Sequence, residues 1–154
     1  MTSDDLTFVS FEPSNSGFVA FISIGWLLSD KEDAETIMRR ATAIYQECIV
    51  GTRLILAEVQ TARSHRQLVP ARKIWRVGDA LFLLVSDLEK LSFKLDNFYG
   101  HLSRDLNVKR KWLEKVIILR RYIPQEATIP EALGWGYFEK GTRRKAQELL
   151  RTLK

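Results

Sequence analysis

A chain of 154 residues suits one domain with one hydrophobic core. Its 45% hydrophobic and 28% charged residues are typical of a globular protein and exclude a disordered chain. Only 8 glycines and 4 prolines interrupt the chain, which favours helices. The single cysteine, Cys48, excludes an intrachain disulfide, and its apolar neighbours at helical spacing favour a small core residue over a nucleophile.

The net charge of +5 is unevenly distributed along the chain. Residues 1–100 hold 11 Lys/Arg and 13 Asp/Glu, a net charge of −2. Residues 101–154 hold 13 Lys/Arg and 6 Asp/Glu, a net charge of +7. A basic segment beside a near-neutral one is typical of a nucleic-acid contact surface, and the alternative is a solvated basic face without a ligand.

Residues 1–29 are expected to form an N-terminal arm. Residues 13–17 predict a turn, and the alternation around Leu6 and Phe8 indicates a short strand before it. The apolar run at 18–28 fits either a buried strand or a short buried helix, which would cover the core or bind a partner.

The same apolar run is too short for a membrane span. It has 11 residues, whereas about 20 are needed to cross a bilayer. Asp4 and Asp5 also stand where a signal peptide would carry basic residues. We therefore expect a cytoplasmic protein without a membrane segment.

A long helix is predicted over residues 30–64. Ser29 and Glu32 have the spacing of a capping box at its start. Gly51 lies on the predicted apolar face, which indicates a close approach of another helix. That face repeats at steps of three and four residues, at Ile37, Ala41, Ile44, Cys48, Gly51, Ile55, Val59 and Ala62.

A second long helix is predicted from Pro70 to about residue 95. Proline suits the first turn of a helix, and the short connection makes an antiparallel hairpin over 30–95. Trp75 and Gly78 lie one turn apart, so that another element can pack close to the helix. The apolar face is formed by Ile74, Val77, Leu81, Leu84, Leu88, Leu91 and Leu95.

Three shorter helices are predicted in the remaining chain, at about 97–105, 109–122 and 139–153, with a loop or abbreviated hairpin at 124–138. The expected fold is therefore an all-α single domain over 1–154, with a short N-terminal strand as an option. A basic helix-turn-helix region at 96–154, ending in a basic C-terminal helix, follows the hairpin.

The segment HLSRDLNVKRKWLEKVIILRRYI has the pattern of a helix-turn-helix. Leu102 and Leu106 face inward from the first helix, Asn107 takes the turn position, and Val108 is the aliphatic residue after it. The second helix opens with basic residues and is anchored by Trp112, Leu113 and Val116.

At these positions the segment resembles the helix-turn-helix superfamily of DNA-binding domains. It departs from the family at Ser103 and Arg104, where a small Ala is common, and at Asn107, where Gly is usual. The alternative interpretation is two packed helices with a basic exterior.

A broader resemblance covers about residues 71–150. "WRVGD", "YGHLSRDL", a tryptophan-bearing basic helix and "LGWGYFEKGTRRKAQELL" follow one another in this order. The order is similar to that of the helical, winged-helix-type domain that precedes the nuclease domain in a group of bacterial restriction-like nucleases. The resemblance implies DNA binding without the nuclease half.

The predicted contact residues are all basic. Four of them, Lys109, Arg110, Lys111 and Lys115, are expected to reach phosphates and base edges. The others are expected to neutralise flanking phosphates from the end of the second helix and from the last helix, at Arg120, Arg121, Lys140, Arg143, Arg144 and Lys145.

No enzyme motif is present, and no catalytic residue, metal or cofactor is expected. The two histidines, His65 and His101, lie far apart in sequence without a partner at ligand spacing. The expected function is duplex DNA binding by a non-enzymatic protein.

The alternative is a helical adaptor or structural subunit of a nucleoprotein or multi-protein complex, which could bind RNA or form homo-oligomers. It would bind its partners through residues 18–28 and through the hairpin. A second apolar stripe on the hairpin, formed by Phe82, Leu83, Val85 and Phe93, favours this alternative.

Overall fold

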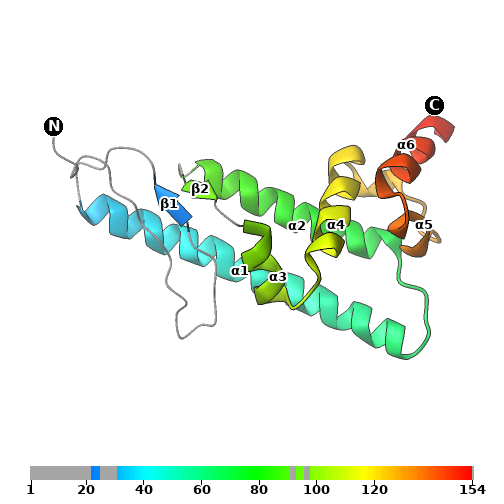
Figure 1. Ribbon diagram of the computed structural model, residues 1–154, viewed down its shortest axis with the longest axis horizontal. Coiled ribbons are helices and arrows are strands. Elements are labelled where there is room, and N and C mark those ends of the chain that lie inside the picture. Colours follow the sequence, from blue (N-terminus) through cyan, green and yellow to red (C-terminus); the bar gives the residue numbers. More distant parts are fainter. Residues whose placement is uncertain (1–21, 25–30, 91–92, 96–97, 154) are drawn as a thin grey trace. The chain divides into compact units, whose positions relative to one another are not determined.

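The computed structural model describes residues 22–24, 31–90, 93–95 and 98–153, and the fold is all-α with one short ribbon of two strands (Figure 1). The predicted cap at Ser29 and the strand around Leu6 and Phe8 lie outside the described residues. The helices are α1 (Lys31–Ser64), α2 (Ala71–Lys90), α3 (Phe98–Leu106), α4 (Arg110–Tyr122), the 3-10 helix η2 (Glu126–Thr128), α5 (Gly136–Glu139) and α6 (Thr142–Thr152).

The ribbon pairs β1 (Ile22–Ile24) with β2 (Phe93–Leu95) in antiparallel register, with Ser23 opposite Lys94. The apolar run at 18–28 thus contains a strand. The prediction that the second helix continues to residue 95 is wrong, because α2 ends at Lys90. Pairing with β1 supplies β2 with backbone hydrogen bonds that a continued helix would otherwise make, and this overrides the helical spacing of the leucines.

Helix α1 agrees with the predicted range, and its predicted face is confirmed in part: Ala41 and Val59 are buried, whereas Ile44, Cys48, Ile55 and Ala62 are half-buried. Tyr45 and the polar Thr52 are buried as well. Gly51 is exposed, and a Cβ built on it meets nothing within 4 Å. The predicted close helix approach at Gly51 is therefore wrong for the described residues.

The apolar face of α2 is confirmed wherever its side chains are described. Each of its predicted core positions up to the end of the helix is at most 2% exposed. Phe82 and Leu83, from the predicted second stripe, are 41% and 49% exposed. The buried positions are Ile74, Val77, Leu81, Leu84 and Leu88.

The described chain divides into two compact units, whose boundaries fall inside α1 and α2 and after the first residue of α4. One comprises residues 1–50 and 83–110, and the other residues 51–82 and 111–154. In the first unit, the buried Tyr45 hydroxyl donates a hydrogen bond to the carboxylate of Asp105, which is also buried. This bond links α1 to α3 and satisfies two polar groups that would be costly to bury alone.

The second unit contains the C-terminal elements. The predicted loop at 124–138 includes the short helices η2 and α5, and α6 begins at Thr142 rather than at 139. Gly141 explains the late start, because its φ of 74° is left-handed and breaks the helical path between α5 and α6. Trp135 and Phe138 fill the core beneath, 2% and 0% exposed.

Candidate nucleic-acid interface

Helix α4 carries five of the predicted contact residues and is held against α2 by close packing. A Cβ on Gly78 would lie 2.6 Å from the carbonyl oxygen of Val116, so only glycine permits this approach. Beyond the end of α4, Trp75 Nε1 donates to the Ile123 carbonyl at 2.6 Å. The predicted role of the Trp75–Gly78 pair in close packing is confirmed.

Arg120 belongs to this packing rather than to the open surface of α4. Its Nε donates to Asp79 Oδ1 at 2.8 Å, and its side chain is 15% exposed. The guanidinium carbon lies 4.3 Å from the ring centroid of Phe82 and 5.5 Å from that of Trp75. These contacts engage Arg120 within the protein, so its guanidinium is not part of the candidate surface.

Two arginines of α2 hold the chain that follows α4. Arg72 Nε donates to the Ile129 carbonyl at 2.5 Å. Arg76 Nε donates to Glu126 Oε1 at 2.5 Å, and this hydrogen bond lowers the pKa of the Glu126 carboxyl. Both arginines therefore fix the segment that leads to α5 and α6.

The first turn of α6 has the features of an anion-facing helix start. It contains no acidic residue, and Gly141 precedes it without a capping side chain. The Thr142 hydroxyl donates instead to the Phe138 carbonyl at 2.7 Å. The first N–H groups of a helix have no partner within the helix, and they favour negative charge nearby.

A surface pocket of about 380 Å³ lies between α4 and this first turn of α6. Lys115 reaches it from α4, and Arg143 and Arg144 reach it from α6. The pocket brings together three of the predicted contact residues from two separate stretches of sequence. Ile118, Gly141, Thr142 and Gln147 complete its lining.

The cations around the pocket are only weakly engaged within the protein. Arg144 lies 4.0 Å from Glu148, and its side chain is 70% exposed. The Arg143 guanidinium lies 5.6 Å from the ring centroid of Tyr122. Lys145 Nζ lies 4.7 Å from the ring centroid of Tyr137, which belongs to α5. The aromatic rings orient these side chains and leave their donors available to an incoming anion.

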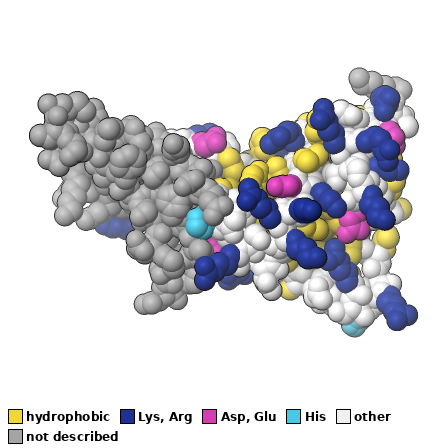
Figure 2. Space-filling view, in the orientation of Figure 1, with side chains coloured by type: hydrophobic (Ala, Val, Ile, Leu, Met, Phe, Trp, Pro, Cys, Tyr) yellow, Lys and Arg dark blue, Asp and Glu magenta, His cyan; other side chains and the backbone are white. Residues whose placement is uncertain are grey.

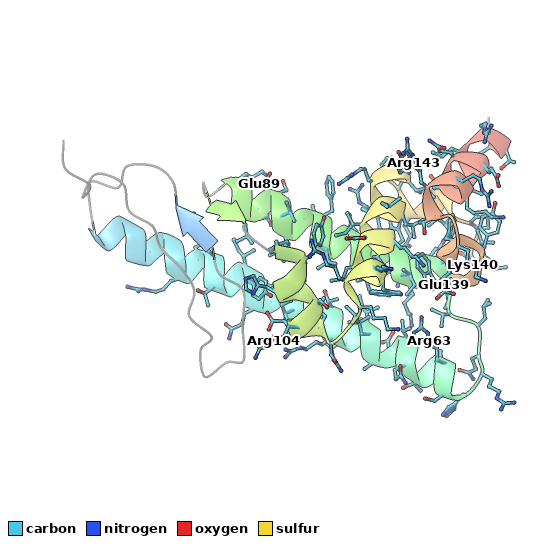
Figure 3. All side chains as sticks on the ribbon, in the orientation of Figure 1. Arg63, Glu89, Arg104, Glu139, Lys140 and Arg143 are labelled. Carbon is cyan, nitrogen blue, oxygen red and sulfur yellow. The ribbon has the colours of Figure 1, made fainter. Side chains whose placement is uncertain are left out.

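Other predicted contact residues lie outside the pocket. Lys111 and Arg121 are exposed on α4, and Lys140 is exposed at the end of α5. Figure 3 shows Lys140 beside Glu139, apart from Arg143. Lys140 therefore lies beside an acidic residue and does not line the pocket.

The predicted turn of the helix-turn-helix is confirmed in the first unit. Asn107 has a φ of 54°, in the left-handed region that asparagine tolerates. Val108 N donates to the Ser103 carbonyl at 3.1 Å, and Ser103 Oγ donates to the Val108 carbonyl at 2.5 Å. Ser103, a departure from the family pattern, thus stabilises the turn itself. Lys109 and Arg110 follow the turn and are exposed.

Charge separates sharply between the two units. The first holds 8 Lys/Arg and 12 Asp/Glu, a net charge of −4, and the second holds 16 Lys/Arg and 7 Asp/Glu, a net charge of +9. Figure 2 shows Lys and Arg side chains gathered on one face of the second unit with few acidic groups between them. Most of the basic residues of 101–154 thus belong to a folded unit that also includes parts of α1 and α2, whereas Arg104, Lys109 and Arg110 belong to the first unit.

The pocket itself was not predicted from the sequence. Gly141 and Thr142 precede the basic run of α6, and a Gly-Thr pair before Arg143 and Arg144 is the signal that could have located a helix start there. No sequence pattern predicts that Gln147 lines the pocket, because its position depends on which face of α6 turns toward α4.

Among the described residues, no group of three or more His, Cys, Asp or Glu could hold a metal ion. His65 is exposed and His101 is half-buried. No helix in the described part of the chain is long and apolar enough to cross a membrane.

Comparisons with protein-family models, with curated proteins and with solved structures gave no match for this chain. The resemblance to helix-turn-helix domains and to the domain preceding restriction-like nucleases therefore stays a prediction from the sequence.

Proposed function

We propose that this protein binds nucleic acid, in the first place duplex DNA, through the basic surface of α4 and α6. The observation that carries the proposal is the pocket in which Lys115, Arg143 and Arg144 converge. Three cations around one concave site would repel each other, and a phosphate group would relieve this repulsion. No acidic side chain lines the pocket.

The proposed mechanism divides the basic residues by their place. A backbone phosphate would occupy the pocket and set the register of the protein on the nucleic acid. Lys111, Arg121 and Lys145 would contact neighbouring phosphates and add affinity that falls with salt. The exposed residues after the Asn107 turn, Lys109 and Arg110, are the candidates for base edges.

Duplex DNA is favoured over RNA because of the local geometry before α4. A left-handed asparagine between two short helices is the connection that a helix-turn-helix requires, and such motifs place their second helix in the major groove. The major groove of RNA duplexes is too narrow for side chains to read. The proposal therefore assigns the groove-facing role to α4.

Fluorescence anisotropy tests the proposal. Labelled random duplex DNA, single-stranded DNA and RNA are titrated with the full chain at two salt concentrations. We expect salt-sensitive binding that is strongest for duplex DNA. Stronger binding to RNA would indicate a subunit of a ribonucleoprotein. No binding at low salt would favour a protein–protein adaptor.

A pair of matched variants locates the surface. Arg143→Gln with Arg144→Gln removes two charges at the pocket. Arg63→Gln with Arg151→Gln removes two charges from exposed positions that do not line it. We expect the first pair to weaken binding about tenfold or more and the second pair to have a much smaller effect. Equal effects would show that binding depends on the net charge of the protein and not on the pocket.

A further inference from the structure

Two rings and a guanidinium form three layers where α4 packs on α2, and Phe82 is the outermost layer. Trp75 and Phe82 lie two turns apart on the same side of α2. The guanidinium carbon of Arg120 lies over both rings, 5.5 Å from the centroid of Trp75 and 4.3 Å from that of Phe82. Trp75 is 8% exposed and Phe82 is 41% exposed. The layers therefore lead from the core of the second unit to its surface and end in an open aromatic ring.

The middle layer is fixed in place by its own contacts. Arg120 Nε donates to Asp79 Oδ1 at 2.8 Å. A Cβ on Gly78 would lie 3.1 Å from the Cβ of Arg120, so the stem of the arginine is closely packed as well. The Phe82 ring thus rests on a guanidinium that cannot easily move away. A ring supported in this way loses little conformational freedom when a flat ligand stacks on it.

The open part of the Phe82 ring is the face that Arg120 does not cover. The guanidinium lies over one face, so the exposed area belongs to the opposite face and the edge. The other aromatic side chains that the structure describes are all buried or half-buried. A large flat apolar face that is held rigid at the surface is suited to stacking.

We propose that Phe82 is a stacking platform for an unpaired base of the DNA that α4 and α6 bind. The inference rests on the proposed function and adds a substrate class to it, namely duplex DNA that contains an unpaired base. Every nucleobase has a π-face, so a platform of this kind accepts any of the four bases.

The charges near the ring favour a nucleotide over an apolar protein partner. The carboxylate of Asp79 is already paired with Arg120, whereas the next residue on α4, Arg121, is exposed and is one of the proposed phosphate contacts. An aromatic ring beside cations is the arrangement with which proteins hold the bases and the backbone of unpaired nucleic acid. The exposed Leu83 points about 100° further around α2, so it does not widen the ring into a broad apolar face.

Anisotropy titrations of the full chain with three duplexes of one sequence test the platform. The first duplex is fully paired, the second carries one extra unpaired adenine at its centre, and the third carries an abasic site in place of that adenine. We expect the second duplex to bind roughly tenfold more tightly than the other two. The abasic duplex keeps the flexibility of the bulge without the base. Equal binding to the second and third duplexes would therefore overturn the stacking role.

Variants at position 82 test whether the preference belongs to the ring. Phe82→Leu should abolish the preference for the unpaired adenine and leave the affinity for the paired duplex unchanged. Phe82→Tyr should retain the preference, because tyrosine keeps the aromatic face. Leu83→Ala is the matched control, since it alters an exposed apolar residue of the same helix, and it should also retain the preference. Circular dichroism verifies that each variant is folded. A preference that survives Phe82→Leu would overturn the proposal and favour a protein partner for the ring.

Photocross-linking of the unaltered chain locates the base directly. Iodouracil takes the place of the unpaired adenine, irradiation joins it to an aromatic ring stacked on it, and mass spectrometry identifies the joined peptide. We expect the peptide that contains Phe82, and its absence among the products would overturn the proposal. A chain that binds none of the duplexes would contradict the proposed function itself. Equal binding to the paired and bulged duplexes would contradict the platform alone.

Discussion

Gly78 and Val116 lie so close that a Cβ on the glycine would sit 2.6 Å from the valine carbonyl oxygen. Since the obstacle is backbone, α4 must shift to accept any side chain there. We expect Gly78→Ala to destabilise the protein by roughly 1–3 kcal/mol, measured by urea denaturation. Gly51→Ala is the matched control, because its Cβ meets nothing within 4 Å. This control should stabilise α1 by about 0.5–1 kcal/mol.

Arg120 and Arg121 are adjacent but should affect different properties. Arg120→Ala removes the partner of Asp79 in a partly buried site and should cost roughly 1–3 kcal/mol of stability. Arg121→Ala changes an exposed residue and should shift stability by less than about 0.5 kcal/mol. In the anisotropy assay, Arg121→Ala should instead weaken binding to DNA. A large loss of stability from Arg121→Ala would contradict the assignment.

The indole N–H of Trp75 should contribute more to the stability of the fold than that of Trp112. Trp75→Phe leaves the buried Ile123 carbonyl without its donor and should cost roughly 1–3 kcal/mol. Trp112 Nε1 is buried without a hydrogen-bond partner among the described residues, so Trp112→Phe loses no such bond. Thermal unfolding of both variants gives the comparison. Equal costs would show that ring volume, rather than the hydrogen bond, determines the effect.

Binding to duplex DNA should depend steeply on salt. Six cations remain in the proposed surface besides the base-edge candidates. If all six contact phosphate, the logarithm of affinity should fall against the logarithm of salt concentration with a slope of roughly −5. Replacing three of the six by Ala should bring the slope to about half this value. A slope near zero would contradict the electrostatic mechanism. The six are Lys111, Lys115, Arg121, Arg143, Arg144 and Lys145.

The Arg76–Glu126 pair should stabilise the protein only above the acid range. Arg76 lowers the pKa of Glu126 from its ordinary value of 4.5, so the charged carboxylate is favoured in the folded state. Its contribution is present above the unfolded pKa and disappears as pH falls through the folded one. Both side chains are partly exposed, at 56% and 28%, so Glu126→Gln should cost less than about 1 kcal/mol at pH 7. Urea denaturation at pH 7 and pH 3 checks that the wild type and Glu126→Gln no longer differ in free energy of unfolding in acid.

The helices of the hairpin could be predicted from apolar spacing because their buried faces repeat over many turns. The steps from Ile74 to Leu88 match the buried face of α2. The strand at 93–95 could not be predicted in this way, because it forms by pairing with β1, some 70 residues earlier in the chain. Local spacing contains no information about that partner.

The basic residues of the candidate surface could be named from the sequence, but their separation into roles could not. Arg120 and Arg121 look alike in sequence, and only the positions of Asp79 and Phe82 on α2 distinguish them. Likewise, Lys115 and Arg143 are 28 residues apart, and the left-handed Gly141 turns the chain so that both line one pocket.

The contacts of α2 with the segment after α4 have a consequence for how the second unit folds. Trp75 bonds to a carbonyl 48 residues later, and Arg72 to one 57 residues later. Ala71 N and Trp135 N complete the connection, donating to the carbonyls of Leu133 and Val69. During synthesis, the start of α2 therefore cannot form these hydrogen bonds until residues 123–135 have been added to the chain. Such non-local closure slows folding, and the second unit reaches its native packing only once residues 123–135 have been synthesised.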